Sequence, residues 1–402
     1  METPLLRALV RRIRALGPLT VAEYMHTCLL HPQFGYYQRA TEKIGRRGDF
    51  VTAPEVSPVF GELVAIWFLV QWRDWLQSPN QVQLVELGPG RGTLMASILS
   101  TAKQFPEFYR ALQVQLVEAS HSFRAQQQQL LQPFVQDRKV AWLDSIDATE
   151  LDSASSSEHQ QVPVLFLAHE FFDALPVHHF IRSQNDGTTH PEWVERLVDV
   201  DDLSMDRHPR LRFIKSRGTT PAAALWPNHP MIKAVLGCER PESIEVPTHA
   251  LAVMERLARV IQQRRGFALL VDYAKQSKPP LACTLRGVRN HRFEDPLAAP
   301  GEADLTVDVD FALLEKVVRN TAPALRVMSL SQREFLLRMG IETRMQVMKQ
   351  KHQDKAAVLA AAFQRLVSPD AMGQIYQVMS IAMPASNEHL GSRIFPFEDV
   401  AA

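Results

Sequence analysis

An apolar run and a helical pattern meet at Val85-Glu86-Leu87-Gly88-Pro89-Gly90-Arg91-Gly92-Thr93. The 402-residue chain has only 17 glycines, yet three of them fall within five positions here. Glycine lets a backbone turn sharply and leaves no Cβ between the main chain and a bound nucleoside. A plain turn between a strand and a helix does not need three spaced glycines, so the segment predicts a cofactor-binding loop.

The sequence around this loop alternates between predicted strands and predicted helices. Short apolar runs flanked by polar residues predict four buried parallel strands, at residues 82–87, 114–117, 162–168 and 267–271, with a weaker fifth at 139–143. Helical patterns at 93–104 and 122–131 separate several of them. Such alternation is typical of βαβ units with right-handed crossovers, and we therefore expect a doubly wound α/β sheet.

Other segments predict elements outside this alternation. We expect a β-hairpin from residues 193–200 and 211–214, helices at 310–319 and 332–339, a last strand at 377–383, a surface loop at 152–161, and extended or irregular chain at 279–300. By role, the chain divides into an N-terminal helical and loop segment (1–80), a cofactor-binding core (81–275), and a substrate-side segment with the final strands (276–402).

The composition excludes several classes of protein. The 44 basic and 44 acidic residues give a net charge of zero, which removes the simplest argument for a nucleic-acid binder. Three cysteines make no disulfide framework and no zinc-type spacing, so we expect a reducing compartment and no metal site. The longest apolar runs, 63–70 and 356–363, are far shorter than the roughly 20 residues of a membrane-spanning helix.

The N-terminus has two interpretations. An apolar stripe at helical spacing is formed by Leu5, Leu9, Ile13 and Leu16, and arginines lie among them. An Arg-rich amphipathic start is typical of an organelle transit peptide, but it also suits a first helix stopped by Gly17 and Pro18. We favour the helix, because no Ser-rich tract or cleavage-like break follows, and so we expect no clear cleavable presequence.

The glycine spacing discriminates between cofactors. A dinucleotide fingerprint needs a glycine at the sixth position, where Thr93 stands, and a phosphate loop needs Gly-Lys-Ser/Thr, which is missing. The pattern Glu-x-Gly-x-Gly-x-Gly instead resembles the first motif of class I S-adenosylmethionine-dependent methyltransferases. For that ligand, Glu86 can accept hydrogen bonds from the ammonium of the methionine part, and Gly88, Gly90 and Gly92 would lie against the nucleoside.

Two further acids follow the next predicted strands. Glu118 stands at a strand tip, where a carboxylate can accept both ribose hydroxyls. Asp144, after the weaker strand, either lies beside the adenine amine, caps a helix, or is a surface acid.

A pair of carboxylates follows the strand predicted at 162–168. Glu170 and Asp173 are three residues apart, and together they could clamp a guanidinium, which carries five donors in a rigid fork. Holding that group beside a sulfonium methyl would favour in-line transfer through proximity and electrostatics. The structural alternative is a capping acid and a solvated acid, with Phe171 and Phe172 in the core.

Further segments make the chain similar to the MidA family, over roughly residues 5–383. The residues that carry the resemblance are 35–37, 48–57, 87–92, 170–176, 295–297, 300–306 and 332–344. The resemblance implies a class I methyltransferase (Rossmann-like) fold, with extra N-terminal, inserted and C-terminal segments over the cofactor crevice, and S-adenosyl-L-methionine as the cofactor. Eukaryotic members of the family are mitochondrial arginine methyltransferases that symmetrically dimethylate an arginine of a complex I subunit early in assembly.

The resemblance also adds site residues. It implies that the loop at 45–62, otherwise a helix entry with Ser57 before Pro58, folds over the crevice, where Asp49 joins Glu170 and Asp173 as a catalytic residue. His169 takes a position facing the donor methyl, where the family has Asn; as a histidine it would change charge with pH. The chain departs from the family's glycines at two more positions, Asn290 and Ala274.

Other functions share this scaffold, since a fold does not fix a substrate. The alternatives are a non-catalytic complex I assembly chaperone, a methyltransferase acting on a small molecule or RNA, and a nicotinamide enzyme, which Thr93 disfavours. The expected partner is a protein substrate, with no nucleic acid and no membrane span. The expected compartment is the mitochondrial matrix for a eukaryotic source and the cytoplasm for a bacterial one.

Overall fold

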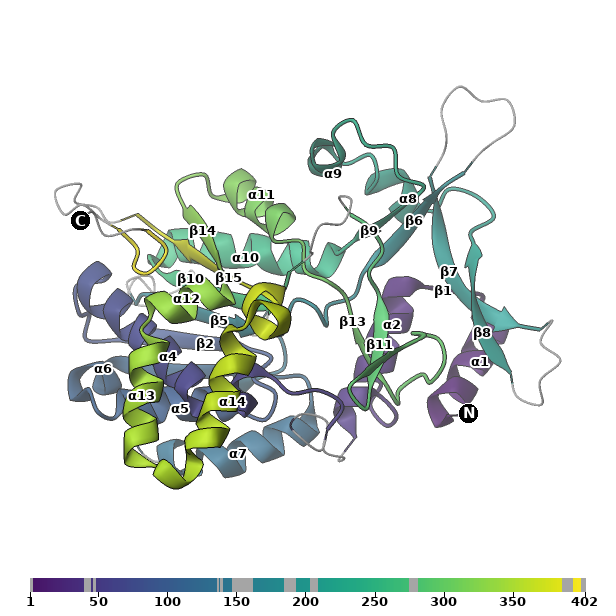
Figure 1. Ribbon diagram of the computed structural model, residues 1–402. Coiled ribbons are helices and arrows are strands. Elements are labelled where there is room, and N and C mark those ends of the chain that lie inside the picture. The colour runs from purple at the N-terminus through teal and green to yellow at the C-terminus, as the bar shows by residue number, and fades with distance from the viewer. Residues whose placement is uncertain are drawn as a thin grey trace. The chain divides into compact units, whose positions relative to one another are not determined.

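The computed structural model describes residues 3–39, 45, 48–135, 137, 140–146, 162–183, 193–202, 209–274, 281–384 and 393–398. The chain divides into two compact units (Figure 1). Unit 1 comprises Met1–Phe50, Asp173–Ala252 and Lys275–Lys316, and unit 2 comprises Val51–Phe172, Val253–Ala274 and Val317–Ala402. Each unit is built from three separate stretches of the chain. The boundaries between the units therefore fall inside the predicted segments 1–80, 81–275 and 276–402 and do not coincide with their ends. That division by role stays a prediction.

Unit 2 is built on a seven-stranded sheet in the order β14-β15-β10-β5-β2-β3-β4. Its strands are β2 (Val82–Leu87), β3 (Leu112–Val117), β4 (Val140–Leu143), β5 (Val164–His169), β10 (Phe267–Tyr273), β14 (Arg326–Ser331) and β15 (Tyr376–Ala382). The strands from β10 to β4 are parallel, and β15 runs antiparallel between β10 and β14. All five predicted parallel strands and the predicted last strand are therefore confirmed, as is the α/β class.

The central strands are buried and their sequences are mostly apolar, with Gln83 and Glu86 the polar residues of β2. All six residues of β2 and all six of β5 are buried. Complete burial is typical of a parallel sheet covered on both sides, and each fully buried leucine stabilises such a core by roughly 1.5–3 kcal/mol. Figure 1 shows α4, α5 and α7 on one side of these strands.

The helices of unit 2 follow sequence signals closely. They are α3 (Ala53–Val56), α4 (Pro58–Val70), α5 (Thr93–Ala102), α6 (Pro106–Ala111), α7 (His121–Val135), α12 (Gln332–Arg338), α13 (Ile341–Lys351) and α14 (Ala356–Val367), with short helical turns at Gln71–Trp75, Gln353–Lys355 and Pro369–Gly373. The predicted helix entry is confirmed, because Pro58 is the first residue of α4 and the Ser57 hydroxyl accepts from the Val59 N–H at 3.3 Å.

Unit 1 contains two smaller antiparallel sheets. One has the order β1-β7-β6-β9 with β8 paired to β7, and the other has the order β12-β11-β13. Their strands are β1 (Leu19–Thr20), β6 (His178–Arg182), β7 (Trp193–Asp201), β8 (Arg210–Lys215), β9 (Ser243–Val246), β11 (Arg286–Arg289), β12 (Arg292–Glu294) and β13 (Asp304–Thr306). The β7–β8 pair confirms the hairpin predicted at 193–200 and 211–214.

The helices of unit 1 include the predicted N-terminal one. They are α1 (Pro4–Leu16), α2 (Val21–Leu30), α8 (Pro221–Leu225) and α9 (Pro230–Leu236), with a short turn at Tyr36–Gln38. Helix α1 begins at a Thr3 cap and ends at Gly17, and the apolar stripe packs into the unit's core except for Leu16, which is exposed. Two helices, α10 (Thr248–Arg264) and α11 (Phe311–Thr321), cross the boundary between the units.

The segment predicted to be extended or irregular at 279–300 is extended over β11 and β12, and these two strands pair as a β-hairpin, which was not predicted. Its turn residues, Asn290 and His291, both have left-handed backbones, with φ of 50° and 60°. Asn-Gly is the usual sequence signal for such a turn, and Asn-His lacks the glycine. The predicted surface loop at 152–161 lies outside the described residues. Among the helices that are described, none has the length and apolar character to cross a membrane.

Candidate functional site

The register of the parallel sheet gathers the predicted cofactor residues at one edge of unit 2. Leu87 pairs with both Val117 and Ala168, and Val117 pairs with Leu143. Residues that follow paired strand ends lie beside one another. The edge therefore carries Gly88, Glu118, Asp144 and His169.

The glycine turn adopts the backbone for which glycine is required. Gly88, Gly90 and Gly92 have φ of 61°, 53° and 82°, in the left-handed region. A Cβ on Gly88 would lie 2.8 Å from Cδ2 of Phe171, so this position has no room for a side chain. Gly92 then caps α5, whose N-terminus opens at the same edge. The turn thus brings bare main chain to the carboxyl end of β2.

Glu86 is a buried acid with one oxygen unused. The residue is 2% exposed, and burial, together with the nearby Glu118 carboxylate, raises the pKa of Glu86 to about 8. Its Oε2 atom is buried and has no hydrogen-bond partner in the part of the chain that the structure describes. An incoming ammonium group would supply both a donor and a positive charge, which is what this atom lacks.

Glu118 is held by the main chain and by a glutamine. Its Oε1 accepts from the Ser120 N–H at 2.7 Å, and its Oε2 accepts from Gln127 Nε2 at 3.1 Å. Burial raises the pKa of Glu118 to about 7, against the lowering effect of these hydrogen bonds. Each carboxylate oxygen can accept a further bond, so the fixed carboxylate still suits a pair of hydroxyls.

Gln127 links the parts of this edge, and sequence reasoning missed it. The residue is fully buried on α7, and its Nε2 also donates to the Gly90 carbonyl at 2.7 Å. Its Oε1 accepts from Trp142 Nε1 at 2.9 Å. The available signal was the run of glutamines at 126–129, but such a polar run is typical of a solvent-exposed helix face. Only the position of α7 against the sheet shows that Gln127 is buried.

Asp144 is the least enclosed of the predicted cofactor residues. Its side chain is 81% exposed and pairs with Arg124 at 2.6 Å between Nη2 and Oδ1. Arg124 Nε also donates to the Glu118 carbonyl at 2.7 Å. The ion pair places Asp144 near Glu118, while its role toward an adenine amine stays a prediction.

His169 is a neutral residue at this edge. It is 8% exposed, and burial lowers its pKa to about 3, so the expected change of charge with pH does not occur in the ordinary range. Its ring meets that of Phe60 edge to face, with 5.2 Å between centroids. Among the described residues, its buried Nε2 has no hydrogen-bond partner. Burial thus favours the neutral imidazole at this edge.

Glu170 stands on a strained turn that other residues support. Its φ is 49°, which is uncommon for a residue with a side chain, and its N–H donates to the Val271 carbonyl at 2.9 Å. Its Oε1 accepts from the Tyr376 hydroxyl at 2.6 Å. Asp272 completes the frame, because its Oδ2 accepts from the N–H groups of Phe171 and Phe172 at 3.2 and 3.0 Å.

Tyr376 and Asp272 were not predicted as site residues. They come from β15 and β10, which reach this turn only through strand pairing that no local pattern shows. Asp272 directly follows the apolar run 267–271, as Glu118 follows 114–117, although β10 itself continues to Tyr273; this position after an apolar run was the signal available in the sequence.

The other two predicted catalytic residues belong to unit 1. Asp173 is 6% exposed, and its Oδ2 accepts from the Thr306 hydroxyl at 2.7 Å. Burial raises the pKa of Asp173 to about 6, against the lowering effect of Thr306 and Arg286. Asp304, a further buried acid, accepts from the Tyr37 hydroxyl at 2.8 Å, and burial, with the Asp173 charge, raises its pKa to about 8.

Asp49 accepts hydrogen bonds from three residues within unit 1. Its Oδ2 accepts from the Tyr36 hydroxyl at 2.8 Å, and its Oδ1 accepts from the Asn290 N–H at 2.9 Å. Its carbonyl accepts from the His291 N–H at 2.9 Å. We refer to Tyr36, Tyr37, Asp49, Asp173 and Asp304 as the acid–tyrosine cluster. In the described residues, no group of His, Cys, Asp and Glu side chains is arranged to hold a metal ion.

Comparisons with known proteins agree with this geometry. Residues 63–328 match the profile of a family described as "Putative S-adenosyl-L-methionine-dependent methyltransferase". The chain is 36% identical over 403 residues to the mitochondrial protein arginine methyltransferase NDUFAF7 of Mus musculus, covering 97% of this chain and 87% of the relative. The Homo sapiens protein of that name is 34% identical, with 94% and 83% covered. The Drosophila melanogaster homolog is 33% identical, with 96% and 86% covered.

Two crystal structures from Burkholderia thailandensis share the fold. One, bound to S-adenosyl-homocysteine, has a TM-score of 0.76 at 23% identity, with 96% of both chains covered. The other, a native structure, has a TM-score of 0.73 at 22% identity, also with 96% of both chains covered. These likenesses confirm the fold that the resemblance implied.

Proposed function

The chain belongs to the family of S-adenosyl-L-methionine-dependent methyltransferases, and we propose that it methylates an arginine side chain of a protein. The observation that carries the proposal is the left-handed glycine turn next to a buried carboxyl oxygen, on Glu86, that lacks a partner among the described residues. These features fit a ligand that has a nucleoside and an ammonium but no phosphate.

The geometry of unit 2 supports an assignment of the residues that bind the donor. S-Adenosylmethionine supplies an electrophilic methyl group on a sulfonium. We assign the ammonium of its methionine part to Glu86, the nucleoside to the main chain at 88–92, and the ribose hydroxyls to Glu118. His169 would contact the donor as a neutral imidazole, and Asp144 would lie toward the adenine amine.

We propose that Glu170 binds and orients the acceptor guanidinium. A carboxylate can accept two N–H donors of that group in a fixed plane, which holds the attacking nitrogen in line with the methyl. The left-handed backbone of Glu170 and the Tyr376 hydroxyl fix the carboxylate, so little ordering is needed when the acceptor binds. Asp173 and Asp49 remain proposed catalytic residues on the strength of the family resemblance.

The finer acceptor is also a proposal. The relatives are named mitochondrial protein arginine methyltransferases, and 83–87% of each of the three named relatives is covered. We propose a mitochondrial location, a complex I subunit as the acceptor, symmetric dimethylation of its arginine, and a role in complex I assembly.

The test is the transfer of a labelled methyl group to proteins from cells that lack this protein. The purified protein and radiolabelled donor are incubated with extract from cells lacking this protein, and labelled peptides are identified by mass spectrometry. We expect symmetric dimethylarginine on a complex I subunit, and no label with the Gly90→Val variant. Donor binding without any labelled arginine would contradict the arginine proposal while leaving the family assignment intact.

A further inference from the structure

Two arginines face each other across the β11–β12 hairpin of unit 1. The strand register pairs Arg289 directly with Arg292 on either side of the turn. Like charges at opposed positions of an antiparallel pair repel and destabilise it. An anion bound by both guanidinium groups would remove that repulsion.

Neither arginine has a partner among the residues that the structure describes: no hydrogen bond, ion pair or ring contact is formed by either guanidinium. The contrast is Arg286, at the other end of β11. It pairs with Asp308 at 2.6 Å between Nη1 and Oδ1, and it lies 5.0 Å from the ring centre of Phe293. Unit 1 thus pairs one arginine of the hairpin with an acid, while the other two have no such pair in the described part of the chain.

The end of the hairpin is held in place before any partner arrives. Asn290 and His291 form its left-handed turn, and Asp49 accepts from both of their N–H groups at 2.9 Å. Tyr36 in turn fixes the Asp49 carboxylate at 2.8 Å. A fixed loop loses little conformational entropy on binding, so a partner meets a preorganised surface.

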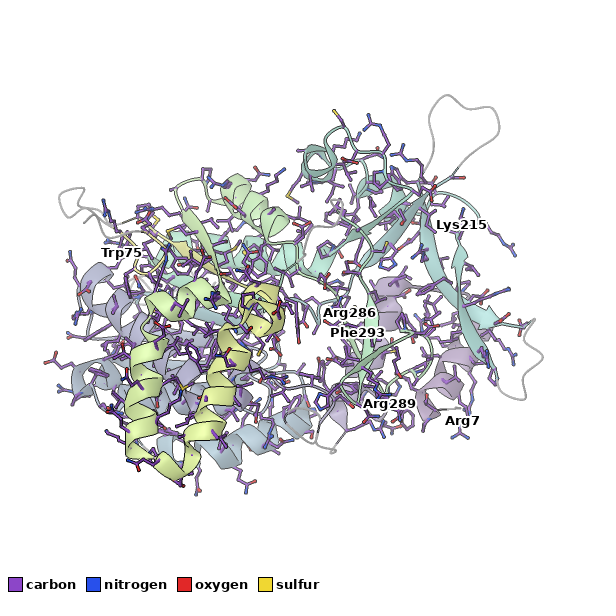
Figure 2. All side chains as sticks on the ribbon, viewed as in Figure 1. Arg7, Trp75, Lys215, Arg286, Arg289 and Phe293 are labelled. Carbon is purple, nitrogen blue, oxygen red and sulfur yellow. The ribbon has the colours of Figure 1, made fainter. Side chains whose placement is uncertain are left out.

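An exposed aromatic side chain follows Arg292 on the same hairpin. Phe293 is 74% exposed, although a phenylalanine gains by leaving water. A hollow of about 460 Å³ is lined by Arg289, Asn290, Arg292, Phe293 and Glu294. Figure 2 shows Arg286, Arg289 and Phe293 on this hairpin. The end of the hairpin therefore offers two cationic forks, with the Glu294 carboxylate among the lining groups, and an apolar ring that the strand register places on the other face.

The charges select the kind of partner. Guanidinium groups bind carboxylates in bidentate pairs, and an exposed aromatic ring binds another apolar side chain. The chain's net charge of zero provides no broad positive field of the kind that nucleic acids need. We propose that the β11–β12 hairpin is a docking surface for a protein partner, with Arg289 and Arg292 binding carboxylates of an acidic segment and Phe293 contacting an apolar side chain within it.

The test measures binding to the full chain by fluorescence anisotropy. The probe is a fluorescein-labelled peptide, Gly-Asp-Glu-Leu-Phe-Glu-Asp-Gly, compared with the same peptide carrying Asn and Gln in place of its acids. We expect the acidic peptide to bind more tightly. Arg289→Ala with Arg292→Ala should weaken it about tenfold or more, which is about 1.4 kcal/mol. The matched control, Lys215→Ala with Arg217→Ala, removes two exposed cations elsewhere on unit 1 and should leave binding unchanged.

A second measurement tests the apolar contact. Phe293→Ala should weaken binding of the acidic peptide. It should not change binding of a second acidic peptide that carries Ser in place of Leu and Phe, because that peptide already lacks the apolar contact. Thermal unfolding of each variant confirms that it is folded.

Three results would overturn the proposal: equal binding of the acidic and amide peptides, equal binding by the double-arginine variant, or tighter binding of single-stranded DNA at this hairpin. The inference needs no methyl transfer. A chain that binds the peptide without methylating arginine would contradict only the proposed function.

Discussion

Buried acids gather in two regions of this protein, at the sheet edge of unit 2 and in the acid–tyrosine cluster of unit 1. Burial raises the pKa of Glu86 at the edge and of Asp304 in the cluster to the same value, about 8. Their surroundings differ, because Asp304 accepts from a tyrosine hydroxyl, whereas Glu86 has an oxygen without a partner in the described residues. A raised pKa therefore marks burial in both regions, and these two acids differ in that only Glu86 keeps an oxygen without a hydrogen-bond partner among the described residues.

The largest expected effect comes from filling the glycine turn. Gly90→Val should weaken donor binding by more than about 100-fold, because a branched Cβ would occupy the space of the nucleoside. Isothermal calorimetry measures the affinity. Gly340→Val is the matched control, since Gly340 has a φ of 83° and a Cβ added there would meet nothing within 4 Å. It also places a side chain on a left-handed backbone, so it should lose stability but bind the donor normally; equal binding by Gly90→Val would contradict the assignment.

Removing the unused acceptor should have the next largest effect. Glu86→Gln deletes the charge that would meet the ammonium, and we expect roughly tenfold to 100-fold weaker donor binding, about 1.4–2.8 kcal/mol. Calorimetry again reports it. Glu107→Gln removes an exposed carboxylate from the same unit and should change nothing. If both variants bind equally, the ammonium lies elsewhere.

Tyr376→Phe tests the frame around Glu170. Deleting one hydroxyl should lower kcat several-fold to about tenfold through a less well-fixed carboxylate, while donor affinity stays the same. Steady-state kinetics with the labelled acceptor separates kcat from the donor KM. The control is Tyr109→Phe, which removes another hydroxyl of unit 2. A change in donor affinity instead of kcat would show that Tyr376 serves the cofactor rather than the acceptor.

The last prediction concerns stability and pH. An acid whose folded pKa is raised stabilises the fold fully below its unfolded pKa, near 4, and this stability is lost as pH rises toward the folded pKa of about 8. Glu86→Gln and Asp304→Asn should each flatten the fall in melting temperature between those values. In the wild type, a saturating concentration of donor should also flatten this fall in melting temperature, because the ammonium lowers the pKa of Glu86. The donor should not change the part of the fall that comes from Asp304.

The sheet and the glycine turn could be predicted from the sequence because both depend on neighbouring residues. Four of the six residues at 82–87 are Val or Leu and the segment is bounded by polar residues and glycines, which predicts a buried strand, and the strand has those bounds. Asp49 shows the opposite case, because its bond to Asn290 joins residues 241 positions apart. Tyr376 reaches Glu170 across 206 positions. Such partners depend on how the sheets pair, and no local spacing encodes them.

The chain crosses between its two units after Phe50, Phe172, Ala252, Ala274 and Lys316. The strand between β14 and β10 is supplied by residues 376–382, which follow every other strand of the central sheet along the chain. During synthesis the seven-stranded sheet can therefore be completed only after this segment has left the ribosome. A premature stop before residue 376 removes both an interior strand and the tyrosine that holds Glu170.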